Sequence, residues 1–286
     1  MLHRSTIQLL RFHFSIFLLP VYLFALSQVP EVDWADALLV FTVLHVLVYP
    51  SSNGYNSYMD RDTSPIGGLE KPLQPTRQLF YVTVIMDAAA IALGLVVSIY
   101  FAAGVALYIL ASRAYSYRGI RLKKYPVTGY LVVVIFQGAL TFVLAYHGSS
   151  RGHSFNVPVW GVAAAACLIG GYYPLTQVYQ HAEDKADGVT TISYVLGKRG
   201  TFIFCGLVFS IATACMFFLF NDKGNLWPFY LFLLCMGPMV WFFIQWMRKV
   251  WQHEQHASFR NSLVMNVLAA VCTTVCFIIM IINKAV

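Results

Sequence analysis

Two polar segments of the sequence carry the oxygen-bearing side chains that bind hard metal ions. The first begins after Pro50, where the chain can continue as a helix, and ends at a run of glycines and prolines after residue 64. Its polar side chains recur at three- and four-residue spacings, which place them on one helical face: Asn53, Asn56, Ser57, Asp60 and Ser64. This face predicts a row of oxygen ligands.

The second segment lies between residues 179 and 191, and it pairs Gln180 with Asp184 and Glu183 with Asp187 at i, i+4 spacing. Mg²⁺ commonly takes one or two carboxylates together with substrate phosphate oxygens and water. Acidic residues in loops are often only solvated. Two such segments at matching places in the chain favour a shared magnesium diphosphate site.

The surrounding sequence predicts that membrane helices position both segments. Hydrophobic residues make up 59% of the 286 residues and charged residues 11%, whereas about a quarter of an ordinary soluble domain is charged. Apolar runs of the length needed to cross a bilayer recur along the whole chain. We predict an all-α integral membrane bundle, a single domain over residues 1–286, with nine spans: Leu9–Ser27, Ala35–Pro50, Leu79–Ser98, Ala102–Ser116, Val127–Tyr146, Val157–Val178, Thr201–Phe220, Trp227–Met247 and Leu263–Ile282.

The basic residues are unevenly divided between the two sides that this topology defines. One side receives most of the 19 lysines and arginines: Arg4, Arg11, Arg61, Lys71, Arg77, Arg113, Arg118, Arg121, Lys123, Lys124, Lys185, Lys198, Arg199, Arg248, Lys249 and Arg260. The positive-inside rule then places the N-terminus and both polar segments in the cytoplasm and the C-terminus outside, as in a multi-pass protein of the cell (inner or plasma) membrane. The charges border apolar spans, so they indicate contact with the lipid bilayer and not with nucleic acid.

The two segments resemble the motifs of the UbiA superfamily of intramembrane prenyltransferases, Asn-Asp-x-x-Asp-x-x-x-Asp and Asp-x-x-x-Asp, and the resemblance covers nearly the whole chain. Asn56 and Asp60 match the first motif, and Asp184 matches the second. Departures from the motifs replace three family acids with Ser57, Ser64 and Gln180, while Asp62 offers a compensating carboxylate. Further similarity lies in the frame after the second motif and in the segment after the fourth span: Gly188, Thr191, Leu196, Gly197, Tyr115, Ser116, Arg121, Leu122 and Lys123.

This resemblance implies prenyl transfer from an isoprenoid diphosphate to a small acceptor, expected to be aromatic or a quinone precursor, with Mg²⁺ as cofactor. Asp60 and Asp184 are the expected catalytic metal anchors. The expected metal and diphosphate ligands are Asn56, Asp60, Asp62, Gln180, Asp184 and Asp187, and the expected substrate-binding residues are Asn53, Ser57, Ser64, Tyr115, Arg121, Lys123 and Lys185. Nearby tyrosines, each of which also suits an interfacial aromatic belt, are candidates to stabilise an allylic cation: Tyr55, Tyr58, Tyr172, Tyr173 and Tyr179.

Other functions remain open at this level. A secondary transporter also fits a many-helix protein with an intramembrane carboxylate, Asp87, although transporter sites usually lie near the midplane. A terpene cyclase of the same superfamily, a transferase with a non-aromatic acceptor, and a relative that has lost catalysis are further alternatives. Asp87 fits either a functional acid or a buried paired one, Arg113 either snorkels or faces the diphosphate, and His181 fits a hydrogen-bonded loop histidine or a proton acceptor.

Overall fold

Nine helical spans lie within residues 2–285, the part of the chain that the computed structural model describes, and this confirms the predicted all-α membrane architecture. Three spans are interrupted by tighter or wider turns. The first contains α1 (Arg4–Leu10), η1 (Phe12–Phe17) and α2 (Leu19–Gln28), the second α3 (Trp34–Phe41), η2 (Thr42–Val48) and α4 (Tyr49–Asp60), and the fifth α7 (Pro126–Val133), η4 (Val134–Leu140) and α8 (Thr141–Ser149). The other spans are α5 (Arg77–Val97), α6 (Ile99–Ser116), α9 (Val159–Tyr172) with η5 (Tyr173–Thr176), α11 (Ile192–Asp222), α12 (Trp227–Gln252) and α13 (Phe259–Ala285), and short helices in the connections are η3 (Leu122–Lys124), α10 (His181–Ala186) and η6 (Glu254–His256).

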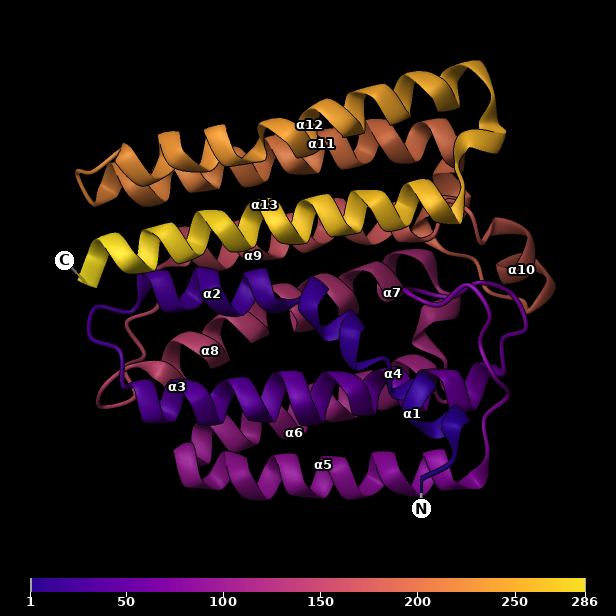
Figure 1. Cartoon of the computed structure of the whole chain (residues 1–286), viewed down its shortest axis with the longest axis horizontal. Helices are drawn as coiled ribbons and strands as arrows, with labels where there is room; N and C mark the ends of the chain where they lie inside the picture. The colour runs from indigo at the N-terminus through magenta and orange to yellow at the C-terminus, as the bar shows by residue number, and fades with distance from the viewer. Residues whose placement is uncertain (1, 286) are drawn as a thin grey trace.

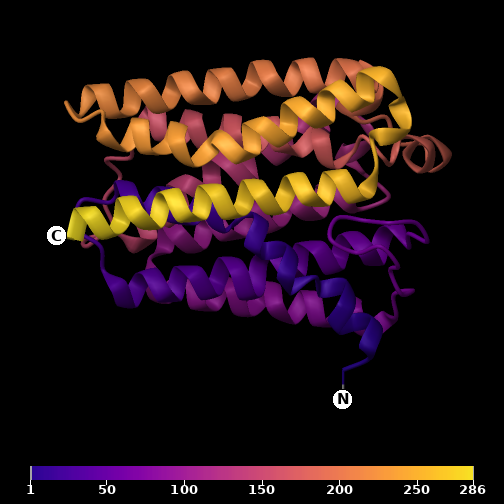
Figure 2. The same ribbon diagram turned by 45° about the horizontal axis from the view of Figure 1, so that its top comes forward.

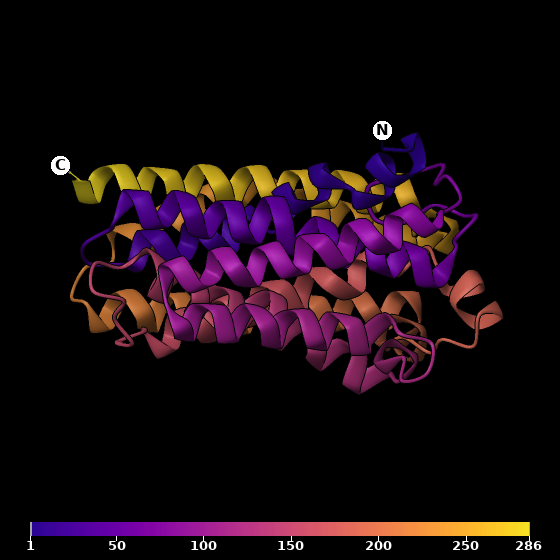
Figure 3. The same ribbon diagram turned by 90° about the horizontal axis from the view of Figure 1, so that it is seen from below.

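The helices run roughly parallel to the long axis of the molecule, and the termini lie at opposite ends (Figure 1). Both polar segments, including α10, lie at the end that holds the N-terminus. Turning the molecule shows α13 between α12 and the first span, where it packs against α2 (Figure 2). On the face opposite α11 and α12, helices α5 and α6 pack side by side (Figure 3).

Two boundaries differ from the predicted spans in ways that concern the site. The second span continues ten residues beyond Pro50 to Asp60, so the first polar segment is helical along its oxygen-bearing face, as expected. The seventh span begins at Ile192 and not at Thr201, because its first two turns are helical but polar; Gly197, at φ +68°, bends it. Hydropathy alone stops at the edge of the apolar run, whereas backbone hydrogen bonding continues past it.

The first span is not the continuous helix that its hydropathy predicts. Arg11 ends α1 in the left-handed conformation at φ +49°, a region that non-glycine residues rarely occupy, and η1 follows as a 3₁₀ helix. The Arg11 side chain is 6% exposed and turns into the bundle. The break therefore delivers a buried cation to the end of the bundle that holds both polar segments.

Small residues allow the central helices to approach closely. A Cβ added to Gly138 of η4 would lie 2.6 Å from the Cα of Ala166 in α9, so this contact is made between backbones. The wider π-helical turn of η4 lies at the same place, and π-helical turns are frequent at functional sites. Large apolar side chains on the outside of the bundle, such as Ile85, Val96 and Leu110, are more than 60% exposed, as expected for a surface that faces lipid.

Candidate active site

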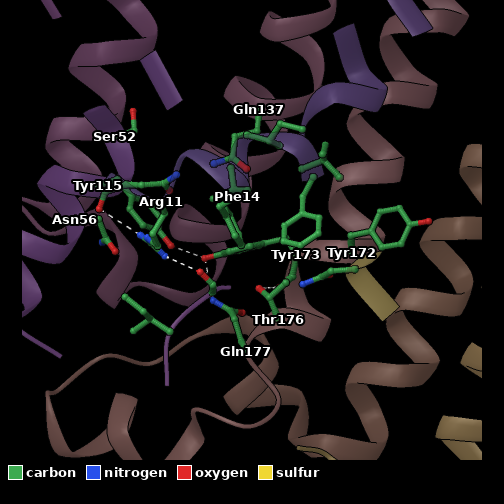
Figure 4. Close-up of a pocket in the computed structure, with 18 of the residues that line it drawn as sticks. Arg11, Phe14, Ser52, Asn56, Tyr115, Gln137, Tyr172, Tyr173, Thr176 and Gln177 are labelled. Carbon is green, nitrogen blue, oxygen red and sulfur yellow. Dashed lines mark hydrogen bonds between the residues drawn. The ribbon is translucent and has the colours of Figure 1, made fainter. Parts of the chain in front are cut away.

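A cavity of about 290 Å³ lies inside the bundle, and residues from both polar segments line it. Eight of the predicted site residues are among its lining side chains: Asn53, Asn56, Asp60, Asp62, Tyr115, Lys123, Gln180 and Asp184. In Figure 4, Asn56, Arg11 and Tyr115 lie on one side of the cavity and Tyr173 and Tyr172 on the other. The chain therefore brings together two segments that are more than 100 residues apart in sequence.

Asp60 is a nearly buried carboxylate at this end of the cavity. Its side chain is 4% exposed and forms an ion pair with Lys123, which reaches it from the connection after α6. The Asn56 amide donates to Asp60 Oδ2 at 2.9 Å and to Ser116 Oγ at 3.0 Å. Asn56 precedes Asp60 by one helical turn, so α4 itself sets the spacing of these two ligand candidates.

The carboxylates of the two segments are partly deprived of solvent and repel one another. Burial, reinforced by the charges of Asp62, Glu183 and Asp60, raises the pKa of Asp184 to about 7, although Lys123 acts in the opposite direction. Burial and the neighbouring Asp60 also raise the pKa of Asp62. Binding of a cation near Asp62 and Asp184 would offset the repulsion between these carboxylates and favour their charged forms.

Hydrogen bonds between backbone and side chains tie the two segments to each other. Gln180 donates through Nε2 to the carbonyl of Pro65 at 3.2 Å, which connects the second segment to the first. Arg121 pairs with the Asp187 carboxylate and also donates to its carbonyl at 3.0 Å. Arg121 Nη2 also lies 3.6 Å from Asp60 Oδ1, and Lys123 pairs with the same carboxylate, so the connection after α6 contacts both segments.

Five predicted site residues do not line the cavity. Ser57 is 2% exposed on the packed side of α4, and Lys185 is exposed on α10. Asp187, which was expected to help bind the metal, forms ion pairs with Arg121 and Arg118, and Arg121 also lies 3.6 Å from Asp60 Oδ1. The full set outside the lining is Ser57, Ser64, Arg121, Lys185 and Asp187.

Two arginines at the site were counted in the sequence only as topology signals. Arg11 lines the cavity and donates to the carbonyls of Gly67 and Asn53, both at 3.2 Å. Arg118 donates to the carbonyl of Met59 at 2.7 Å and to that of Asp60 at 3.3 Å, at the end of α4. No spacing rule singles out either residue, because each acts on backbone carbonyls that only the folded chain brings within reach.

Asp87, Arg113 and His181, for which the sequence left two roles open, each have a polar partner in the structure. Asp87 and Arg113 form an ion pair with each other, and His181 makes a 2.8 Å hydrogen bond with the Ser193 hydroxyl. Of the tyrosines, Tyr172 and Tyr173 line the cavity together with Tyr115, whose hydroxyl bonds to that of Tyr173. The Tyr172 hydroxyl points away from Arg11 and Asn56 (Figure 4).

The donor set fits a divalent cation that shares its ligands with a phosphate group. Within the described part of the chain, Asp60 Oδ1 and Asp184 Oδ2 are buried without a hydrogen-bond partner. Among those same residues, no three histidine, cysteine or acidic side chains lie close enough to hold a metal by themselves. Hard oxygen ligands that leave a coordination shell incomplete are typical of Mg²⁺ sites that phosphate oxygens complete.

The fold and cavity define a helical membrane protein with a polar site at one end of an apolar chamber. The chain belongs to the UbiA prenyltransferase family, which matches residues 16–270. No curated protein sequence matches the chain.

Solved structures share its fold. A UbiA homolog from Archaeoglobus fulgidus bound to GPP and Mg²⁺ has a TM-score of 0.69 at 17% identity, covering 96% of this chain and 99% of that one. The apo structure of a UbiA homolog from Aeropyrum pernix K1 has a TM-score of 0.71 at 20% identity, covering 94% and 98%. A digeranylgeranylglyceryl phosphate synthase structure has a TM-score of 0.62 at 17% identity, covering 98% of both chains.

Proposed function

We propose that this chain, as a single domain, is a membrane-embedded prenyltransferase that moves an isoprenyl group from an isoprenoid diphosphate to a small acceptor. One observation carries the proposal: Asp60 and Asp62 from the first segment and Asp184 from the second line one cavity together with many apolar side chains of the first, sixth and ninth spans. An isoprenoid diphosphate has the same two parts, a charged head that needs metal and an apolar tail that needs a dry chamber.

Asp60 and Asp184 hold the metal in this proposal, with Asn56, Asp62 and Gln180 supplying further oxygens directly or through water. Homologous structures bound to DMAPP or GPP also contain Mg²⁺. When bound, Mg²⁺ offsets charge on the diphosphate and makes it a better leaving group. Asp60 Oδ1 and Asp184 Oδ2, which are buried and accept no hydrogen bond, are the atoms best placed to take part, and Arg121 lies 3.6 Å from the first of them.

The remaining residues act on the substrate itself. Lys123 stands between the carboxylates of both segments and supplies a positive charge for the diphosphate oxygens. As the carbon–oxygen bond breaks, positive charge develops on the allylic carbon, and the ring faces of Tyr115 and Tyr173 stabilise it. The apolar walls keep water from capturing that carbon before the acceptor does.

The test is Mg²⁺-dependent binding of farnesyl diphosphate and release of pyrophosphate by the purified protein in lipid nanodiscs. We expect both to require Asp60 and Asp184, so Asp60→Asn and Asp184→Asn lose them while they still insert in membranes. Glu183→Gln is the matched control, because Glu183 lies beside Asp184 but is exposed outside the cavity lining. Full turnover in both aspartate variants would remove this mechanism.

Product analysis separates the related functions. With phenolic quinone precursors as acceptors, a prenylated phenol supports the aromatic acceptor that we propose. A cyclic hydrocarbon formed without acceptor instead identifies a terpene cyclase, and a prenylated glycerol lipid identifies a non-aromatic acceptor. Uptake of solute into sealed vesicles without pyrophosphate release would favour a transporter.

We also propose that the protein lies in the cell membrane with both polar segments facing the cytoplasm. Most of its basic residues belong to the end of the bundle that holds these two segments. A fluorescent protein fused to the N-terminus should fold and fluoresce, since it stays in the cytoplasm. Alkaline phosphatase fused to the C-terminus should be active, since it is exported. The opposite pair of results would invert the orientation.

A further inference from the structure

The cavity has an apolar part away from its acidic residues. The first, sixth and ninth spans contribute these lining residues, which are apolar except for Thr273: Pro20, Val21, Phe24, Ala165, Leu168, Ile169, Ala269, Ala270, Thr273 and Phe277. Gln137 lines the cavity from the fifth span. Three phenylalanines gather at its deepest point. Phe24 and Phe277 line the cavity, and Phe142 packs behind Phe24.

These rings form a rigid group. The rings of Phe24 and Phe277 stack with centroids 4.7 Å apart and an interplanar angle of 16°, and Phe142 meets Phe24 edge-on at 4.9 Å. Each ring is at most 1% exposed. Phe142 is held in turn by Gly161, where an added Cβ would lie 2.7 Å from its ring. Packed aromatic groups of this kind resist displacement, because moving one ring breaks contacts with the others.

The depth of the cavity can be measured along two helices that run in opposite directions. Its lining residues extend from Ala165 to Thr176 on the sixth span and from Asn266 to Phe277 on the ninth. Each stretch covers eleven residue steps, or about 16 Å at the rise of an α-helix. The Cα–Cβ bond of Phe277 tilts towards the start of α13, which is the acidic end, so its ring takes up part of this length.

An extended carbon chain advances about 1.1–1.2 Å for each backbone bond, as the span of an extended polypeptide shows. On that measure the main chain of a geranyl group is about 8 Å long, a farnesyl group about 13 Å and a geranylgeranyl group about 17 Å. A geranylgeranyl group at about 17 Å is longer than the whole stretch of about 16 Å even before the Phe277 ring is counted, whereas a farnesyl group at about 13 Å is shorter than that stretch.

We propose that Phe24 and Phe277, braced by Phe142, form the floor of the donor cavity and limit the prenyl donor to three isoprene units. This rests on the proposed function, since it assumes that the acidic end holds the diphosphate. Farnesyl diphosphate is then the preferred donor, geranyl diphosphate is accepted with space left over, and geranylgeranyl diphosphate is rejected by the floor.

The experiment measures the affinity of the protein in nanodiscs for geranyl, farnesyl and geranylgeranyl diphosphates with Mg²⁺ and no acceptor. We expect farnesyl diphosphate to bind at least about tenfold more tightly than geranylgeranyl diphosphate, the discrimination typical of a misfit apolar group. Phe24→Ala and Phe277→Ala should remove this preference by deepening the chamber. Ala165→Leu should shift it towards geranyl diphosphate, because its side chain enters the lower part of the chamber.

Phe202→Leu is the matched control, since Phe202 is fully buried in α11 against Trp246 but does not line the cavity. It should lower thermal stability without changing the order of the three affinities. Two results would overturn the proposal that these rings limit donor length. One is equal affinity of the native protein for the farnesyl and geranylgeranyl donors, and the other is an unchanged order of the three affinities in Phe24→Ala, Phe277→Ala and Ala165→Leu. Tight donor binding without any transfer tells against the proposed function alone, whereas failure to bind any of the three donors overturns both.

Discussion

Arg113 and Asp87 form an ion pair between α6 and α5 inside the bundle, with Arg113 Nε 2.9 Å from Asp87 Oδ2. Their side chains are 18% and 16% exposed, and Ser51 of α4 donates to the same carboxylate at 2.6 Å. The Arg113 guanidinium also lies 3.9 Å from the centre of the Tyr55 ring. Three helices are thus joined about one and a half turns before Asn56 and two and a half turns before Asp60 on α4, and Asp87 is a paired acid within the bundle.

Replacing Asp87 with asparagine should destabilise the protein more than it disturbs substrate contacts. Removing one partner of a buried ion pair typically costs about 3–5 kcal/mol, because the other charge is left uncompensated. We expect a lower thermal midpoint in detergent and an almost unchanged Mg²⁺ requirement. The double variant Asp87→Leu with Arg113→Leu should recover most of the lost stability, and a double variant as unstable as Asp87→Asn would contradict this.

Activity should fall as the pH drops through about 7, because burial raises the pKa of Asp184 to that value. Below it the carboxyl is protonated and neutral, so it cannot bind Mg²⁺ well; above it the carboxylate is charged and competent. The measurement is the concentration of Mg²⁺ that gives half-maximal donor binding between pH 5.5 and 8.5. Asp184→Asn should bind Mg²⁺ weakly at every pH, and a pH profile identical to that of the native protein would exclude Asp184 as the titrating group.

Lys123→Met should weaken transfer strongly while leaving membrane insertion intact. Lys123 pairs with the nearly buried Asp60, so its loss leaves that carboxylate with less compensation and removes a charge from the diphosphate site. A fall in kcat/KM of about 10²-fold is the effect expected for losing one electrostatic contact to the reacting group. Lys124→Met is the neighbouring control, because Lys124 does not line the cavity. Equal losses in the two variants would argue for general destabilisation.

Asp187→Asn should act through Arg121 and not through the metal. The Asp187 carboxylate pairs with Arg121 outside the cavity lining, so neutralising Asp187 loosens the second segment without removing a residue that lines the cavity. A double-mutant cycle with Arg121→Ala, followed by Mg²⁺-dependent donor binding, measures this. Because Arg121 also lies 3.6 Å from Asp60 Oδ1, Arg121→Ala should be the more damaging single variant. We expect the double variant to be no worse than the more damaging single one. Additive losses of donor affinity in the double variant would instead indicate that Asp187 binds the metal.

Much of the site was predictable because helical spacing is a local property. Asn56 and Asp60 share one face of α4 through their four-residue separation alone, and the polar run after residue 178 marks Asp184 as its partner. The resemblance to the UbiA superfamily aligns both segments with its two motifs. Oxygen-rich side chains in a chain of such high mean hydropathy are conspicuous, so composition and spacing carried this part of the prediction.

The nine apolar runs and the division of basic residues belong to the sequence itself, since the bilayer demands about 20 apolar residues for each crossing whatever the packing. Only the tertiary structure decided which charges neutralise each other. Arg121 forms ion pairs with both Asp187 and Asp60, Arg113 forms one with Asp87, and a left-handed turn at Arg11 places that side chain inside the bundle. These pairings depend on contacts between helices distant in sequence, where burial strengthens electrostatic attraction and penalises every charge left alone.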